Sequence, residues 1–165
     1  MPTYHSVTQQ IVKLLESRDY WFETFEHEAV RTSEEAAKVR TGYSLEQGAK
    51  AIIIRVKRSK KDKEFVMVVL PGHQRFDGKK IKNLLGAKDI RFATTEEVGE
   101  LTDGIEPGGV PPFGNLFDMK VIVDPSLMKL EKIVFNAGDR RFSVAMKAED
   151  YKEMVSPEVV DIMTS

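Results

Sequence analysis

The sequence contains no cysteine, and this absence removes several chemistries at once. Without a thiol the chain has no disulfides, no cysteine nucleophile, no thiolate zinc site and no iron–sulfur cluster. Only three histidines are present, His5, His27 and His73, and no two of them stand one helical turn apart. We therefore expect no metal site. The lack of cysteine fits a cytoplasmic protein, although secreted proteins can lack cysteine as well.

Long apolar runs and the common enzyme motifs are also missing. No run approaches the ~18 residues of a membrane helix, so no membrane contact is expected, and residues 1–5 do not open a secretory signal. A phosphate loop, a dinucleotide-binding glycine motif, a nucleophile elbow and His-Glu-x-x-His are all absent. This argues against common NTPases, dehydrogenases, α/β-hydrolases and zinc proteases. The 165 residues, 41% hydrophobic and 31% charged, predict one globular domain spanning residues 1–165.

Positive charge is concentrated in one stretch, although the formal net charge of the chain is only -1. Residues 50–91 contain 13 lysines and arginines against four acidic residues, so the remainder of the chain is net negative. Such asymmetry predicts either a face that binds a polyanion or a solvated hairpin tip with an exposed helix face. The charge pattern alone favours neither interpretation.

The residue pattern predicts alternating helices and strands in an α+β domain. We expect helices at 3–18, 34–40, 77–85, 95–102 and after Ser156, and strands at 21–25, 49–56, 64–70, 90–92, 120–123, 132–135 and 142–146. Capping boxes at Thr32–Glu35 and Thr94–Glu97 support two of the helices. Residues 57–63 form the charged turn of a long hairpin, and Ala137–Asp139 form the turn of the last one. The element order predicts a mixed, largely antiparallel sheet with helices packed around it.

Lys50 is the first residue that could carry chemistry. It stands at the head of an apolar strand, between Ala49 and Ala51. Lysine at such a position either extends to water at the strand mouth or points as a cation into a pocket. The residue pattern by itself favours the first interpretation, because lysines at strand ends are common.

Two further features follow in the second half of the chain. The segment Gly108–Gly114 combines glycines, which permit close backbone approach to a ligand, with prolines that hold a loop rigid. Asn136 stands at a strand end and offers both a donor and an acceptor. A structural crossover loop and an ordinary turn residue are the alternative interpretations.

Several short blocks between His27 and Asp150 follow one another in a recognisable order. They are His27 with Thr32–Ala37, Gly48–Ala51, Leu70–Gly72 with Arg75 and Asp77, Leu84–Gly86, Ala93 with Glu96–Val98, Gly108–Gly114, Val123–Asp124 and Asn136–Gly138. In this order they resemble the YbaK/ProX family of aminoacyl-tRNA deacylases, which includes the editing domain of bacterial prolyl-tRNA synthetases. The helix expected at 3–18 lies outside the strongest match.

The resemblance implies a fold, a reaction and a set of site residues. The implied fold is a mixed sheet curled into a partly closed barrel with helices outside. The implied reaction is hydrolysis of the ester that joins a wrong amino acid to a tRNA, without a cofactor. Lys50 matches the central functional residue of the family, and we predict that it holds either the terminal adenosine phosphate or the ester carbonyl. We predict that the amides of Gly108 and Gly109 stabilise the developing oxyanion.

The predicted substrate contacts fall into two sets. Residues expected around the aminoacyl group are His27, Ala51, Val110, Pro111, Pro112, Phe113, Asn136 and Gly138. Residues expected along the tRNA backbone are Lys57, Arg58, Lys60, Lys61, Lys79, Lys80 and Lys82. Contacts of the second kind are sensitive to salt and insensitive to base sequence.

Three functions compete at this stage. The first is a trans-editing hydrolase that removes a small amino acid such as Ala or Cys, with tRNA-Pro as the expected carrier. The second is an inactive tRNA-binding module of the same fold, associated with an aminoacyl-tRNA synthetase. The third is an unrelated small-molecule hydrolase. The expected partners are the aminoacylated acceptor end of tRNA and, as a second candidate, a synthetase. Ala51 and Pro111 depart from residues common in relatives, so the amino acid stays open.

Overall fold

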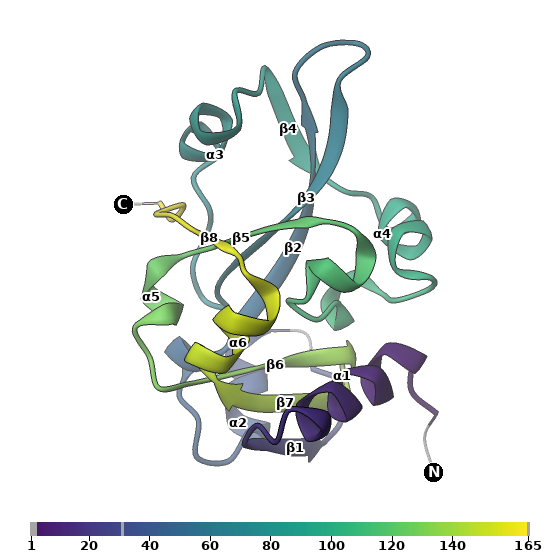
Figure 1. Cartoon of the computed structure of the whole chain (residues 1–165), viewed down its shortest axis with the longest axis vertical. Coiled ribbons are helices and arrows are strands. Elements are labelled where there is room, and N and C mark those ends of the chain that lie inside the picture. Colours follow the sequence, from purple (N-terminus) through teal and green to yellow (C-terminus); the bar gives the residue numbers. More distant parts are fainter. Residues whose placement is uncertain (1–2, 31, 165) are drawn as a thin grey trace.

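The computed structural model describes residues 3–30 and 32–164, which form two β-sheets with helices around them (Figure 1). The helices are α1 (Ser6–Ser17), α2 (Ser33–Val39), α3 (Gly78–Leu85), α4 (Thr95–Thr102), α5 (Pro125–Met128) and α6 (Ala148–Val155), with 3-10 turns η1 (Leu45–Gln47), η2 (Pro107–Gly109) and η3 (Gly114–Phe117). The strands are β1 (Phe22–Glu26), β2 (Ala49–Lys57), β3 (Lys63–Pro71), β4 (Asp89–Phe92), β5 (Lys120–Val123), β6 (Lys132–Asp139), β7 (Phe142–Lys147) and β8 (Glu158–Val159). None of the helices in the described ranges is both long and apolar enough to cross a membrane.

The two sheets differ in topology. The smaller sheet has the order β1-β7-β6 and is antiparallel throughout. The larger sheet has the order β4-β2-β3-β5-β8, in which β5 runs parallel to both of its neighbours. This confirms a mixed α+β domain. Within the described residues neither sheet closes on itself, so the pairings do not confirm the expected partly closed barrel; a single bridge between Gly48 and Val134 joins the two sheets.

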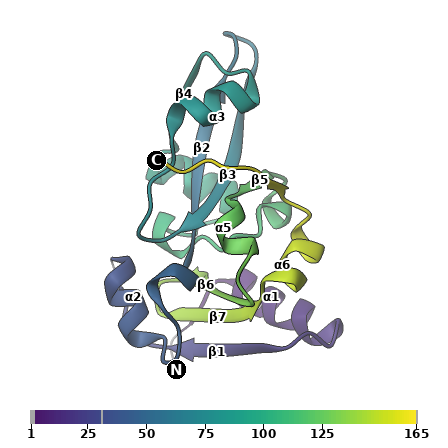
Figure 2. The same cartoon turned by 90° about the vertical axis from the view of Figure 1, so that its left-hand side faces the viewer.

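The β2–β3 hairpin forms the longest strand pair of the larger sheet. Its two nine-residue strands pair in unbroken register from Ala49 with Pro71 to Lys57 with Lys63. The lower half crosses the body of the protein, whereas the tip extends away from it beside β4 and α3 (Figures 1 and 2). The predicted hairpin and its charged turn are therefore confirmed.

Side chains alternate across β2 and feed two separate hydrophobic clusters. Ala49 and Ile53 belong to the main core, which the smaller sheet, α1 and α6 also line. Ile54 and Val56 belong to a second cluster that includes the buried side of α3. Because successive strand residues point to opposite faces, a single apolar strand serves both clusters.

Local sequence signals fix several helix ends as expected. Thr94 and Glu97 form the capping box at the start of α4, with each side chain bonded to the backbone of the other. The Asp77 carboxylate accepts hydrogen bonds from the backbone amides of Lys79 and Lys80 at the start of α3. Gly86 ends that helix with its backbone in the left-handed region.

Two expectations about the end of the chain are wrong. No helix follows Ser156 in the stretch described up to residue 164: α6 ends at Val155, Ser156 adopts a positive φ of 50°, and the next residues include β8 beside β5. The helix lies earlier because Tyr151 and Val155, one turn apart, bury the same face of α6. Residues 137–139 are not the last hairpin turn, since β6 continues to Asp139 through an irregularity in the register with β7.

Gly138 is part of that irregularity, and its backbone has a φ of +104°. A Cβ atom there would lie 2.7 Å from both Thr8 Oγ1 and Val7 Cγ1 on α1. Next to it, the Thr8 hydroxyl donates a 2.6 Å hydrogen bond to the Ala137 carbonyl. Gly138 therefore lets α1 dock closely on β6, and this packing accounts for the glycine.

We predict that Gly138→Ala lowers the free energy of unfolding by about 2 kcal/mol or more, through the strained φ and the contact with α1. Gly99→Ala in α4 is the matched control, since a Cβ there meets nothing within 4 Å. It should raise stability by roughly 0.5–1 kcal/mol through helix propensity. Urea unfolding of the three proteins measures both effects, and equal midpoints would contradict the assignment.

Candidate active site

A cavity of about 340 Å³ opens beside the first half of β2. Its walls come from α2, η1, β2, the end of β4, α4, η2 and β6. Five of the predicted site residues line it: Lys50, Ala51, Gly108, Val110 and Asn136. The fold thus brings together the three features that sequence reasoning singled out separately.

One wall of the cavity is an open strand edge. β4 pairs with residues 54–57 of β2, and the Ile53 carbonyl accepts the Ala93 amide at 2.9 Å just beyond that ladder. Backbone groups in an antiparallel strand alternate between its two neighbours, so the Ala51 N–H and C=O point to the same side as those of Ile53. Here β4 has ended, and the main chain of Ala51 faces the cavity.

Lys50 is half-buried in the cavity lining, and its Nζ donates a 2.8 Å hydrogen bond to the Gln74 carbonyl. Burial, and then the positive charge of Arg75, lower the pKa of Lys50. No salt bridge in the described part of the chain neutralises its charge. The ammonium is therefore held in a fixed place with donor capacity left for a ligand.

Asn136 connects two walls of the cavity. Its Nδ2 donates to the Gly108 carbonyl at 2.8 Å, and its Oδ1 accepts from Arg40 Nη2 at 3.0 Å. The residue therefore fixes the position of η2 relative to α2, because it satisfies one group from each.

The Ser143 hydroxyl extends this network away from the cavity. It is fully buried and lies 3.0 Å from Arg40 Nε, 3.2 Å from Asn136 Oδ1 and 2.8 Å from His27 Nε2. His27 is thus linked to the cavity wall through Ser143 and does not line the cavity itself.

Arg40 is an element of the site that sequence reasoning missed. It is the C-cap residue of α2, only 6% of it is exposed, and it borders the cavity. Burial lowers the pKa of Arg40 to about 10, so the guanidinium is still charged at neutral pH. Arg140 and Phe92 also line the cavity and were not predicted. The residue pattern does not single out Arg40, Arg140 and Phe92 as site residues, because the residues around them in the structure come from distant parts of the chain.

The glycine–proline loop divides into a cavity part and a core part. The Gly109 amide donates to the Glu106 carbonyl at 2.8 Å, and a Cβ at Gly109 would lie 3.2 Å from the Asp139 backbone. That amide is therefore engaged within the loop, which corrects its predicted use for an oxyanion. Gly108 is exposed, and its Cα lies against the Arg140 guanidinium.

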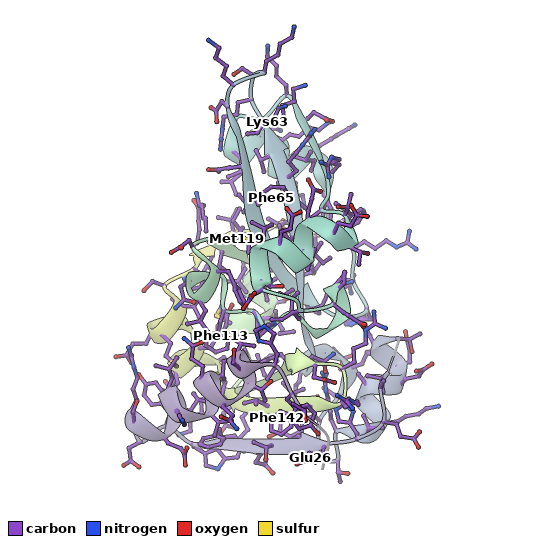
Figure 3. All side chains as sticks on the ribbon, turned by 90° about the vertical axis from the view of Figure 1, so that its right-hand side faces the viewer. Glu26, Lys63, Phe65, Phe113, Met119 and Phe142 are labelled. Atoms are coloured by element: carbon purple, nitrogen blue, oxygen red, sulfur yellow. The ribbon has the colours of Figure 1, made fainter. Side chains whose placement is uncertain are left out.

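The rest of the loop anchors it to the interior (Figure 3). Pro111, Pro112 and Phe113 are buried, and none of them lines the cavity. The Phe113 ring packs on Phe135 and Tyr151 with centroids 5.4 and 5.6 Å apart, and the Tyr151 hydroxyl donates to the Pro112 carbonyl at 2.6 Å. These residues hold the loop in place against the core, just as Gly138 leaves room for α1 to pack on β6.

The basic residues of the hairpin and α3 are not equally available. Arg58 pairs with Asp62 and Glu64 and also donates to the Leu85 carbonyl. Lys80 pairs with Asp161 and donates to the Met163 carbonyl. No salt bridge between described residues involves the other predicted lysines, which are Lys57, Lys60, Lys61, Lys79 and Lys82. Long side chains project from the hairpin tip, near the labelled Lys63, at the opposite end of the molecule from Glu26 (Figure 3).

Comparisons with known proteins indicate the aminoacyl-tRNA editing family. A family described as the aminoacyl-tRNA editing domain matches residues 27–154. The multifunctional Ser/Thr-tRNA deacylase ProXp-y of Escherichia coli K12 is 35% identical over 158 residues, which cover 94% of this chain and 93% of that protein. A proline–tRNA ligase of Bacillus licheniformis is 38% identical over 96 residues, 58% of this chain but only 16% of the ligase. A solved structure described as a candidate trans-editing enzyme for prolyl tRNA synthetase has the same fold, with a TM-score of 0.82, 24% identity and coverage of 99% and 100%.

We predict that Ser143→Ala destabilises the protein by about 1–3 kcal/mol, because it leaves Arg40 Nε and His27 Nε2 without their shared partner. Ser17→Ala is the control, since the exposed Ser17 hydroxyl bonds only the Leu14 carbonyl at a helix end. Its effect should stay within about 0.5 kcal/mol. Urea unfolding gives both values, and a Ser143→Ala effect as small as the control would show that the network adds no stability.

Proposed function

Because the chain belongs to the family of aminoacyl-tRNA editing domains, we propose that it is a trans-editing deacylase that hydrolyses mischarged aminoacyl-tRNA. The observation that carries the proposal is the cavity beside β2. Every residue that lines it falls between Val30 and Arg140, within the segment that matches the family, and Lys50 and Gly108 are among them. The likeness to a solved structure described as a candidate trans-editing enzyme for prolyl tRNA synthetase supports action in trans.

The residues present suit hydrolysis of an ester that is already activated. An aminoacyl ester needs no strong protein nucleophile, so positioning and charge stabilisation supply much of the acceleration. In our proposal, water attacks the ester carbonyl, assisted by the free ribose hydroxyl. The Lys50 ammonium, with the backbone of Gly108, stabilises the negative charge that develops on the carbonyl oxygen. The C–O bond to ribose then breaks, and the ribose oxygen takes up a proton.

The cavity favours a small amino acid. Ala36, Ala37, Ala51 and Val110 give it short apolar walls within its volume of about 340 Å³. Ala or Cys carried by tRNA-Pro remains our first substrate proposal. Ser and Thr are the second candidates, because the E. coli relative is named for deacylation of Ser- and Thr-tRNA.

The hairpin offers the remainder of the tRNA-binding surface. A strand rises roughly 3.3 Å per residue, so Lys57 lies roughly 20 Å from Lys50 along β2. We propose that Lys57 and the tip lysines Lys60 and Lys61, with Lys79 and Lys82 of α3, contact the acceptor-stem backbone while its end enters the cavity. Arg58 and Lys80 contribute less, since intramolecular partners engage both.

The partner and the compartment follow from the substrate. The match to a proline–tRNA ligase supports a synthetase as a second partner, and a tRNA substrate supports a cytoplasmic protein. An inactive tRNA-binding module is the alternative function. Such a module would present the same cavity and the same basic surface as the deacylase, and it would differ only in that it does not hydrolyse the ester.

We predict that Lys50→Ala lowers the deacylation rate by about 100-fold or more, because the charge that stabilises the oxyanion is lost. The assay follows loss of radiolabelled amino acid from a panel of Ala-, Cys-, Ser- and Thr-charged tRNAs under single-turnover conditions. The half-buried Lys50 loses a single 2.8 Å hydrogen bond to the Gln74 carbonyl when it is replaced, so the variant should keep the wild-type unfolding midpoint within a few degrees.

Lys13→Ala on the exposed face of α1 is the control for the loss of one lysine and should retain full activity. Full activity of folded Lys50→Ala would refute the role of this lysine. If the wild-type protein hydrolyses none of the esters yet binds tRNA, the inactive-module alternative replaces the proposal.

The pH profile gives a second prediction. Lys50 must be protonated to stabilise negative charge, so activity should fall as pH rises through its pKa. Arg75 contributes to lowering that pKa, and Arg75→Gln should therefore raise it and move the alkaline limb to higher pH. Single-turnover rates, corrected for spontaneous ester hydrolysis at each pH, measure the shift. Arg18→Gln at the end of α1 should leave the limb unchanged, whereas a shift in the opposite direction for Arg75→Gln would contradict a cationic role.

A further inference from the structure

The position of the Lys50 ammonium depends on a loop outside its own strand. Lys50 stands opposite Leu70 in the β2–β3 register, so its side chain projects from the sheet face on which the second hydrophobic cluster lies. The acceptor of its 2.8 Å hydrogen bond is the Gln74 carbonyl, which belongs to loop 72–77 between β3 and α3. Whatever holds loop 72–77 therefore also sets the place of this charge.

Loop 72–77 is attached to the body of the protein at its first residue. The Gly72 amide donates to the Gly48 carbonyl at 2.9 Å, and a Cβ at Gly72 would lie 2.5 Å from Ser33 Oγ. The Gln74 amide then donates back to the carbonyl of Pro71 at 3.0 Å. These contacts fix the start of the loop, and its second half is held by a different element.

That element is the C-terminal segment, residues 160–164, which runs from β8 across the larger sheet toward the loop (Figure 2). Thr164 donates both its amide and its hydroxyl to the Arg75 carbonyl, each at 3.0 Å. The Ile162 carbonyl accepts the Asp77 amide at 2.6 Å. The C-terminal segment thus binds the backbone of the loop directly after Gln74.

Apolar contacts accompany these hydrogen bonds. Met163 pairs with Phe76 in an antiparallel bridge, and both are partly buried against the second hydrophobic cluster. Ile162 belongs to that cluster and is fully buried. The cluster also contains Ile54 and Leu70, from the sheet face that carries Lys50. The C-terminal segment is therefore packed on the same face as the lysine.

The end of β5 holds the C-terminal segment in turn. The Val160 amide donates to the Val123 carbonyl at 3.1 Å, and the Ile162 amide donates to Asp124 Oδ1 at 3.3 Å. Asp124 is 2% exposed, and neither it nor Val123 lines the cavity. The sequence block Val123–Asp124 therefore anchors the C-terminal segment to the larger sheet.

We propose that Ile162 and Thr164 are positioning residues for the Lys50 ammonium, because they hold loop 72–77 where the Gln74 carbonyl meets Nζ. The contacts run from β5 to the C-terminal segment, from there to Arg75, and through the adjoining peptide to Gln74. The effect on catalysis rests on the proposed function. If the loop is released, Nζ keeps its charge but loses its fixed place beside the ester, and positioning is a large part of such catalysis.

Thr164→Pro tests the hydrogen bonds to the loop, since proline has neither an N–H nor a hydroxyl to donate to the Arg75 carbonyl. Lysine labelled with 15N at Nζ reports the result in NMR spectra, because burial and a hydrogen bond slow the exchange of ammonium protons with water. We expect the Lys50 ammonium signal, assigned by its absence in Lys50→Arg, to be present in the wild-type protein and lost in Thr164→Pro. Thr164→Ser keeps both donors and should retain the signal.

Ile162→Ala and Leu85→Ala form a matched pair that separates positioning from stability. Both residues are buried in the second hydrophobic cluster, but Leu85 is the last residue of α3 and lies at the end away from loop 72–77. Both variants should unfold at lower urea concentration than the wild-type protein. Only Ile162→Ala should weaken the Lys50 ammonium signal, and equal weakening in the two variants would overturn the proposal.

Deacylation measures the consequence for the reaction. Thr164→Pro should lower the single-turnover rate at saturating enzyme by about tenfold or more, because a misplacement of about 1 Å can cost that much. The enzyme concentration that gives half the maximal rate should not change, because the lysines of the hairpin tip are untouched. Thr164→Ser should retain the wild-type rate. Loss of the ammonium signal with an unchanged rate would contradict a role in the reaction.

The spectra decide the positioning role independently of activity. A Lys50 signal that is absent from the wild-type protein, or unchanged in folded Thr164→Pro, would overturn the proposal. If Thr164→Pro does not fold, the comparison of Ile162→Ala with Leu85→Ala decides the question. If the wild-type protein hydrolyses no ester, the proposed function fails, whereas loss of the signal in these variants would still uphold the positioning of Lys50.

Discussion

The geometry of the site depends on the side-chain amide of Asn136. One end of this amide holds the Gly108 carbonyl and the other holds the Arg40 guanidinium, so a single planar group sets the distance between η2 and α2. An amide is suited to this task because it donates at one end and accepts at the other. A carboxylate at the same position would accept from Arg40 but repel the Gly108 carbonyl. The cavity is therefore held open by polar contacts, whereas apolar packing of Phe113 and Tyr151 holds the loop from behind.

The proposed chemistry and the proposed tRNA-backbone contacts lie at opposite ends of one hairpin. Lys50 lies where β2 enters the body of the protein, and the tip lysines lie where the same strand leaves it. The apolar residues between them feed two hydrophobic clusters, so the hairpin is rigid over the length that joins the two ends. Because β4 covers only the outer part of this strand, the inner part keeps the open edge from which one cavity wall is made.

Sequence reasoning succeeded where a local rule or an ordered set of motifs applied. The capping box at Thr94 and the apolar run of β2 were available from neighbours along the chain. The neighbours of Lys50 favoured exposure to water, and only the ordered motifs of the family pointed to a place in the cavity. It failed where the deciding contact is distant. Gly138 and Phe113 look like parts of a ligand loop, yet α1 and the rings of Phe135 and Tyr151 explain them. Arg40 could not be found, because its partners Asn136 and Ser143 lie about a hundred residues away.

The Ser143 hydroxyl has two acceptors within reach but only one hydrogen to give. His27 Nδ1 faces the Glu28 carbonyl at 2.8 Å and must carry a hydrogen there, so in the neutral ring Nε2 is an acceptor. The serine hydrogen then points to Nε2, and Asn136 Oδ1 goes without it. The orientation of one hydroxyl in the core is therefore set by a ring outside the cavity, and the amide that holds the cavity open is left to the guanidinium of Arg40.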